Sequence, residues 1–232
     1  LKKDNTRAEW IRGISHDIRT PLSIVLGYAS EIEDTVSLPE ATRKQAGIIR
    51  RYSEKLKNLV ADLNLTTKLE YSIQPLQKQK IDPVELARQV VSEVLNDGIS
   101  ELYELELSED NPGKNLSLVG DQALLSRMLN NLIRNCIVHN PDGCTIQVSV
   151  GSCDAMCTFS VTDNGYGISE PQLNALNSGK DISSTQKQTG ETEHGLGLKI
   201  VMQIVKAHQG IIQFADTIPH GLSIHISLPM KL

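Results

Sequence analysis

The chain has 232 residues, of which 39% are apolar and 22% are charged, and its formal net charge at neutral pH is -5. A chain of this length can bury one large core or two ordinary ones. The acidic balance and the lack of a basic stripe argue against a nucleic-acid-binding protein, and no run of about 18 apolar residues marks a membrane span.

The start of the chain and the cysteines add two expectations. The sequence opens at Leu1 rather than Met, carries no secretory signal and enters a helical pattern at once, so we expect a part of a longer protein. The four cysteines show neither paired spacing nor a zinc-ligand pattern, so we expect free thiols.

The first part of the chain predicts two long helices joined by a turn at Ser37-Leu38-Pro39. In each helix apolar residues recur alternately three and four positions apart, which is typical of a packing seam. One seam runs through Ile11, Ile14, Ile18, Pro21, Val25, Tyr28 and Ile32, and the other through Ile49, Tyr52, Leu56, Leu59, Leu63 and Thr66. Two helices cannot bury both seams, so we predict a four-helix bundle of two copies, with an intramolecular bundle as the alternative.

The rest of the chain predicts a second domain. We expect a helical hairpin over residues 1–72, a linker over 73–80 and a catalytic domain over 81–232. In that domain we expect helices at 83–95, 122–138 and 195–208, and strands at 103–107, 115–119, 145–150, 157–162, 211–215 and 222–228. This alternation indicates an α+β sandwich with helices on one face of a mixed sheet.

The first helix carries a string around His16 that includes Asp17, Thr20 and Pro21. At about 100° per residue His16 faces away from the apolar seam, so its imidazole is expected in solvent, where it is a competent nucleophile. Asp17 could accept a proton from the ring, Thr20 lies one turn further on, and Pro21 is expected to bend the helix. A solvated surface histidine is the alternative interpretation of this residue.

Three further motifs suit a nucleotide. Asn131 and Asn135 share one helix face and can present amide oxygens to Mg²⁺. Asp163, followed by Gly165 and Gly167, can accept the exocyclic amine of adenine while the glycines let the backbone approach the ring, although such a string is also a common turn. The first turn of the last helix, Gly195-Leu196-Gly197, offers amide groups to phosphate.

Order and spacing together resemble the histidine kinase branch of the GHKL ATPases, from Trp10 to Pro229. The string around His16 resembles the H box, and the asparagine motif resembles the N box. The resemblance implies a Bergerat-type ATP pocket, ATP and Mg²⁺ as cofactors with Asn135 as the metal ligand, a homodimer, and a mobile lid over residues 178–194. Lys180 and Lys187 of this lid could reach phosphates, but solvated charges are the favoured interpretation of both.

The resemblance also implies a reaction and a setting. His16 accepts the γ-phosphoryl group and passes it to an aspartate on a response regulator receiver domain. The position of Thr20 implies a possible phosphatase activity toward that regulator. The parent protein would sit in the inner or plasma membrane with this part on the cytoplasmic side, without membrane contact of its own.

The sequence departs from the family at three points. Val138 stands where a phosphate-binding lysine is common, His139 where an aromatic residue is common, and the phenylalanine box before the lid is absent. Two other functions remain open: a degenerate kinase that serves as a dimeric scaffold, and an ATPase of the chaperone or topoisomerase type.

Overall fold

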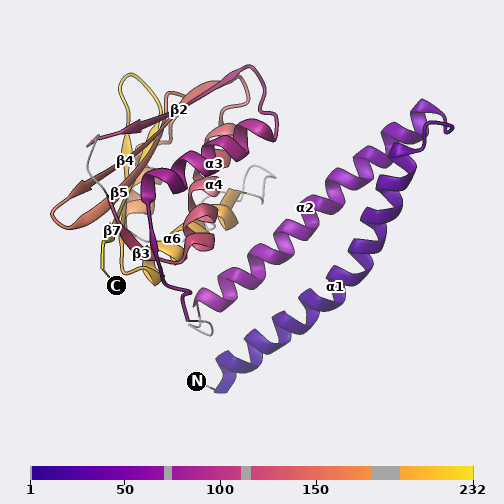
Figure 1. Cartoon of the computed structure of the whole chain (residues 1–232), viewed down its shortest axis with the longest axis horizontal. Coiled ribbons are helices and arrows are strands. Elements are labelled where there is room, and N and C mark those ends of the chain that lie inside the picture. Colours follow the sequence, from indigo (N-terminus) through magenta and orange to yellow (C-terminus); the bar gives the residue numbers. More distant parts are fainter. Residues whose placement is uncertain (1, 71–74, 111–115, 179–193, 232) are drawn as a thin grey trace. The chain divides into compact units, whose positions relative to one another are not determined.

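The computed structural model describes residues 2–70, 75–110, 116–178 and 194–231. The chain divides into two compact units, Leu1–Gln74 and Pro75–Leu232, which are described separately (Figure 1). None of the helices within the described ranges combines the length and apolar content needed to cross a bilayer.

The first unit is a hairpin of two long helices, α1 (Lys2–Asp34) and α2 (Glu40–Glu70) (Figure 1). The amide of Leu38 donates to the carbonyl of Thr35, and the amides of Thr42 and Arg43 donate to the carbonyl of Pro39, which closes the turn and starts α2. The predicted helical hairpin, with its turn at residues 37–39, is therefore confirmed.

Small side chains make the contact between α1 and α2. Ala29, Ala46 and Ser53 are buried, whereas Tyr28 and Tyr52 are each 64% exposed within the chain. Small residues let two helices approach closely, but they leave the larger apolar side chains of the seams uncovered. The hairpin alone thus presents an apolar surface of the kind that protein–protein interfaces bury.

An ionic cluster near the turn fixes the register of the hairpin. Nε of Arg50 lies 2.6 Å from Oε2 of Glu33, and Nε of Arg43 donates to the carbonyl of Glu33 at 2.8 Å. The hydrogen bond from Arg50 lowers the pKa of Glu33. Because these side chains are part-exposed, we assign the cluster a role in alignment rather than a large share of stability.

The second unit contains a five-stranded sheet and a separate two-stranded one. In the larger sheet β2 (Tyr103–Glu109) pairs in parallel with β4 (Cys144–Cys153), and the remaining pairs are antiparallel, in the order β2-β4-β5-β7-β6. The other strands are β5 (Met156–Asp163), β6 (Ile211–Asp216) and β7 (Leu222–Pro229). The smaller sheet pairs β1 (Gln79–Ile81) with β3 (Leu118–Gly120).

Helices α3 (Pro83–Asn96), α4 (Gln122–His139) and α6 (His194–Ala207) cover one face of the larger sheet (Figure 1). Alternate residues of β5, including Phe159 and Val161, are buried beneath them. The carboxylate of Asp82 accepts from two amides at the start of α3, and that of Asp121 accepts from the amide of Leu124 at the start of α4. This two-layer arrangement confirms the predicted α+β sandwich.

Two short elements were not predicted. Helix α5 (Glu170–Asn177) buries only Leu176 and is started by a capping box in which Gln172 accepts from the amide of Ser169. Strand β1 begins at Gln79, so its first two residues lie within the segment predicted as linker. Strand β1 depends on pairing with β3, which a local pattern does not report, whereas the capping box of α5 is a local signal that the prediction overlooked.

A buried histidine joins α6 to the start of α4. His208 is 1% exposed, its Nδ1 donates to the carbonyl of Ile204 at 2.8 Å, and its Nε2 accepts from the amide of Asp121 at 3.0 Å. The ring is therefore neutral, because a proton on Nε2 would face the Asp121 amide. Burial lowers the pKa of His208, and the charge of Lys78 acts in the same direction while that of Asp121 opposes it.

This histidine predicts a pH dependence of stability. Its folded-state pKa is lowered, so the unfolded chain binds the proton more tightly; the contribution of His208 is complete above the ordinary value of about 6.5 and is lost as the pH falls below it. We expect the unfolding midpoint of the second unit to fall between pH 7.5 and pH 5, and to fall less in His208→Gln. Thermal unfolding at several pH values measures this, and equal slopes for the two proteins would contradict it.

Candidate functional site

Helix α4 brings the two predicted asparagines against the start of α6. The buried residues of α4, among them Leu125 and Leu132, fix its apolar face in the core and turn Asn131 and Asn135 toward α6. Nδ2 of Asn131 donates to the carbonyl of Gly197 at 3.5 Å. A Cβ placed on Gly197 would lie 3.5 Å from Oδ1 of Asn135, so the asparagine motif and the glycine turn are neighbours.

The glycine turn itself, Gly195 to Gly197, lies in the first turn of α6, which begins at His194. The first amides of a helix have no partner within the helix and can donate to an anion. Leu196 is half-buried. The side chain of His194 lies outside the described part of the chain, and so does nearly all of the predicted lid.

Asp163 ends β5 with its carboxylate almost buried, at 6% exposed. Its Oδ1 accepts from the amide of Gly165 at 2.9 Å and from Nδ2 of Asn140 at 3.3 Å. Asn140 follows α4 directly and is itself 2% exposed. Helix α4 therefore carries the asparagine motif on one side and supports Asp163 at its end.

The loop after Asp163 requires glycine. A Cβ on Gly165 would overlap the side chain of Asn140, and Gly167 has a φ of +67°. Gly221 has a φ of +131°, and a Cβ there would overlap the backbone oxygen of Asp163. Glycine adopts a positive φ and allows such close backbone approach at little cost in free energy, because it has no Cβ.

Two thiols lie against this carboxylate. Burial and the charge of Asp163 raise the pKa of Cys136 and, to a smaller extent, that of Cys144. Both thiols are therefore neutral and add no second negative charge beside Asp163. All four cysteines are free, as the sequence predicted.

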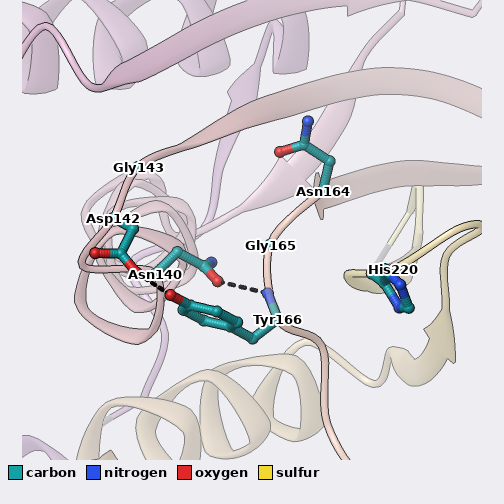
Figure 2. A pocket seen from close by; sticks show the side chains of 7 residues that line it. All are labelled: Asn140, Asp142, Gly143, Asn164, Gly165, Tyr166 and His220. Atoms are coloured by element: carbon teal, nitrogen blue, oxygen red, sulfur yellow. Dashed lines mark hydrogen bonds between the residues drawn. The ribbon is translucent and has the colours of Figure 1, made fainter.

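A cavity of about 470 Å³ opens beside the loop (Figure 2). Its lining residues are Asn140, Asp142, Gly143, Asn164, Gly165, Tyr166 and His220. The hydroxyl of Tyr166 donates to Asp142, and this hydrogen bond raises the pKa of Tyr166 (Figure 2). Asn135 and Gly197 are not among the lining residues, so this cavity adjoins the base end of the predicted site and not its phosphate end.

The predicted phosphoacceptor lies in the other unit. His16, Asp17 and Thr20 lie within two turns of α1, which continues through Pro21. Asp17 and Thr20 are exposed, and the side chain of His16 lies outside the described part of the chain.

Sequence reasoning missed two residues of the site, Asn140 and Gly221. Asn140 opens an Asn-Pro-Asp-Gly string, which is a strong turn signal, and Gly221 precedes a strand. The turn signal correctly places a turn after α4. It contains no information on the contact with Asp163, which is 23 residues away along the chain.

Two family models match the chain. Residues 6–72 match the His Kinase A (phospho-acceptor) domain, and residues 120–232 match the histidine kinase-, DNA gyrase B-, and HSP90-like ATPase domain. The sensor histidine kinase YvrG of Bacillus subtilis is 31% identical over 210 residues, which are 89% of this chain and 36% of that protein. The chain thus spans about a third of the length of this curated relative.

Solved structures share the fold. The full-length structure of ShkA in complex with AMPPNP has a TM-score of 0.75 at 24% identity and covers 95% of this chain and 45% of that one. Histidine kinase ThkA in complex with the response regulator protein TrrA has a TM-score of 0.63 at 22% identity, over 99% of this chain and 64% of that one.

A helical hairpin with a phosphoacceptor motif, followed by a sandwich of the ATPase type, defines the core of a histidine kinase. The two family models together account for both units. The chain belongs to the two-component sensor histidine kinases.

Proposed function

We propose that this chain autophosphorylates His16 with ATP and then transfers the phosphoryl group to an aspartate of a response regulator receiver domain. The observation that carries the proposal is the convergence on α4: Asn131 and Asn135 lie against the glycine turn of α6, and Asn140 holds Asp163. The phosphoacceptor motif stands in a separate unit, which suits a reaction in which one domain presents the nucleotide to another.

The nucleotide would be held at its two ends. Asp163 accepts a hydrogen bond from the 6-amino group of adenine, and the amides of Gly195, Leu196 and Gly197 donate to the phosphates. Gly165 leaves room for the side chain of Asn140 beside Asp163, and Gly167 supplies the positive φ of the loop. These roles supply positioning and charge stabilisation, which dominate phosphoryl transfer.

Asn135 fits a magnesium ion. Its amide oxygen is a hard donor, it is only half-buried, and it lies beside the glycine turn where phosphates would bind. Asn131 is the neighbouring ligand for nucleotide. Bound there, Mg²⁺ would neutralise charge on the phosphate chain.

The transfer step joins the two units. A ring nitrogen of His16 forms a bond to the γ-phosphorus while the bond from that phosphorus to the bridging oxygen breaks and ADP leaves. Asp17, the next residue, accepts the proton of the other ring nitrogen, so that the phosphorylated imidazole is left neutral.

The labelling test of this proposal uses the whole chain with γ-labelled ATP and Mg²⁺. We expect label that is labile to acid and stable to alkali, and none when EDTA removes the metal. Nucleotide binding without any label would leave a scaffold, and ATP turnover without labelled protein would favour an ATPase of the chaperone or topoisomerase type.

Substitution of the predicted adenine carboxylate tests the base end separately. In Asp163→Asn the amide oxygen can still accept from Gly165, so the fold is kept, but the charged acceptor for the adenine amine is lost. Hydrogen bonds to charged groups contribute about 1.5–3 kcal/mol, so ATP affinity should fall by about 10- to 100-fold. Calorimetric titration with ATP measures this. Asp216→Asn, also at the end of a strand, is the control and should bind as the parent does.

Two partners are proposed for this chain, a second copy of itself and a response regulator receiver domain. We propose a homodimer through the uncovered seams of α1 and α2, where Tyr28 and Tyr52 are exposed in the single chain; sedimentation equilibrium should give twice the 25.5 kDa chain mass. Addition of the correct receiver domain should remove label from the chain.

We also propose that the parent protein is membrane-anchored with this core on the cytoplasmic side, which fractionation of cells would test.

A further inference from the structure

Asn140 uses every hydrogen-bonding group of its side chain between α4 and the loop after β5. Nδ2 of Asn140 donates to the carbonyl of Cys136 at 2.8 Å and to Oδ1 of Asp163 at 3.3 Å. Figure 2 shows the third hydrogen bond, in which Oδ1 of Asn140 accepts from the amide of Tyr166 at 2.9 Å. The reverse amide orientation would set oxygen against the two acceptors and nitrogen against the Tyr166 amide. The network therefore defines one orientation of the side chain.

Only an amide side chain supplies this combination. An aspartate in the same place has acceptors but no donor, and an alanine has neither. The site is also closed to adjustment, because Asn140 is 2% exposed and the neighbouring Gly165 has no space for a Cβ beside it. A buried network of this kind holds its members in place only when each of them is satisfied.

From these contacts we infer that Asn140 is a positioning residue for base recognition: it holds the carboxylate of Asp163 in the orientation that accepts the 6-amino group of a purine. The inference rests on the proposed role of Asp163 and deepens it. Asn140 acts through Asp163 and needs no contact of its own with the nucleotide. Its loss should therefore reduce the discrimination between a 6-amino and a 6-oxo purine, and not only the stability of the domain.

The discrimination test compares dissociation constants of the whole chain for ATP and for inosine triphosphate, which carries a 6-oxo group. A site built to pair with a hydrogen-bond donor rejects the analogue that lacks it. We expect the parent to prefer ATP, and Asn140→Ala to reduce that preference by about three- to tenfold, mainly through weaker ATP binding. An unchanged preference in Asn140→Ala would overturn the inference.

A matched control separates positioning from stability. The side-chain amide of Asn177 also makes two hydrogen bonds. It donates to the carbonyl of Phe214 at 2.9 Å and accepts from the backbone amide of Phe214 at 3.0 Å. Asn177 is exposed, so Asn177→Ala should lower the unfolding temperature less than Asn140→Ala does, and it should keep the preference for ATP. If both variants lose the preference equally, Asn140 has only a structural role.

The variant Asn140→Asp adds a pH profile. It places a second carboxylate beside Asp163, and two adjacent carboxylates share a proton at a raised pKa. At pH 8 this variant should bind ATP at least about tenfold more weakly than the parent, and at pH 6 the deficit should shrink as one shared proton restores a donor. The other titratable groups around the loop are common to both proteins, so the parent at each pH is the reference. These groups are Cys136, Cys144, Asp142, Tyr166 and His220. A deficit independent of pH would contradict the inference.

Failure of the proposed role of Asp163 would give a different set of results from failure of the positioning role of Asn140. If the parent shows no preference for ATP, or if Asp163→Asn keeps it, then Asp163 does not read the base and the proposed site is wrong. If Asp163→Asn loses the preference while the Asn140 variants retain it, only the positioning role of Asn140 is wrong.

Discussion

In His16→Gln the label transferred from γ-labelled ATP should fall to background, while ATP binding stays at the parental value. Glutamine keeps a polar side chain in α1 but has no imidazole, and therefore no nitrogen that can form a bond to phosphorus. ATP binding is retained because the nucleotide motifs all lie in the other compact unit. Labelling followed by gel autoradiography, with parallel ATP titration, measures both quantities.

A histidine outside the phosphoacceptor string is the control for this experiment. His225 bonds to Ser223 on the sheet face away from the helices, at 2.9 Å between Nε2 and Oγ. His225→Gln should be labelled as the parent is. Full label on His16→Gln would move the acceptor to another residue, whatever the family match.

The second large effect is expected for Gly165→Ala. The added methyl group would overlap the side chain of Asn140, which is buried and makes three hydrogen bonds, so that either the loop or the asparagine must move. Overpacking of this kind and the loss of buried hydrogen bonds together destabilise by about 3 kcal/mol. For a unit of this size the unfolding temperature should fall by about 10 °C, and ATP binding should be lost with the orientation of Asp163.

Two other glycines calibrate that result. A Cβ on Gly197 would make an ordinary contact at 3.5 Å, and one on Gly27 in α1 would meet nothing within 4 Å. Gly197→Ala should therefore keep the unfolding temperature, and Gly27→Ala should keep or slightly raise it, since alanine favours a helix over glycine by about 1 kcal/mol. Equal unfolding temperatures for Gly165→Ala and Gly197→Ala would contradict the steric argument.

The sequence alone determined the features that depend on neighbouring residues. The three-four spacing predicted the hairpin, Asp121 marked the start of α4, and the order of the asparagine, Asp163 and glycine motifs predicted the family. Helical period and capping are properties of a few consecutive turns, and the order of the motifs is a property of the linear sequence, so all three can be read without the fold. The same spacing placed Asn131 and Asn135 on one face, where the structure sets them against Gly197.

The tertiary structure decided which distant residues meet. Strand β1 exists because Gln79 to Ile81 pair with β3. His208 acquires its lowered pKa from burial, at a place where its Nε2 accepts from the amide of Asp121, 87 residues away. Asn140 reads as a turn residue in the sequence and becomes the support of Asp163 only when α4 packs under the end of β5. Contacts of this kind follow from strand order and register, which bring together groups whose separation along the chain has no period that a sequence could display.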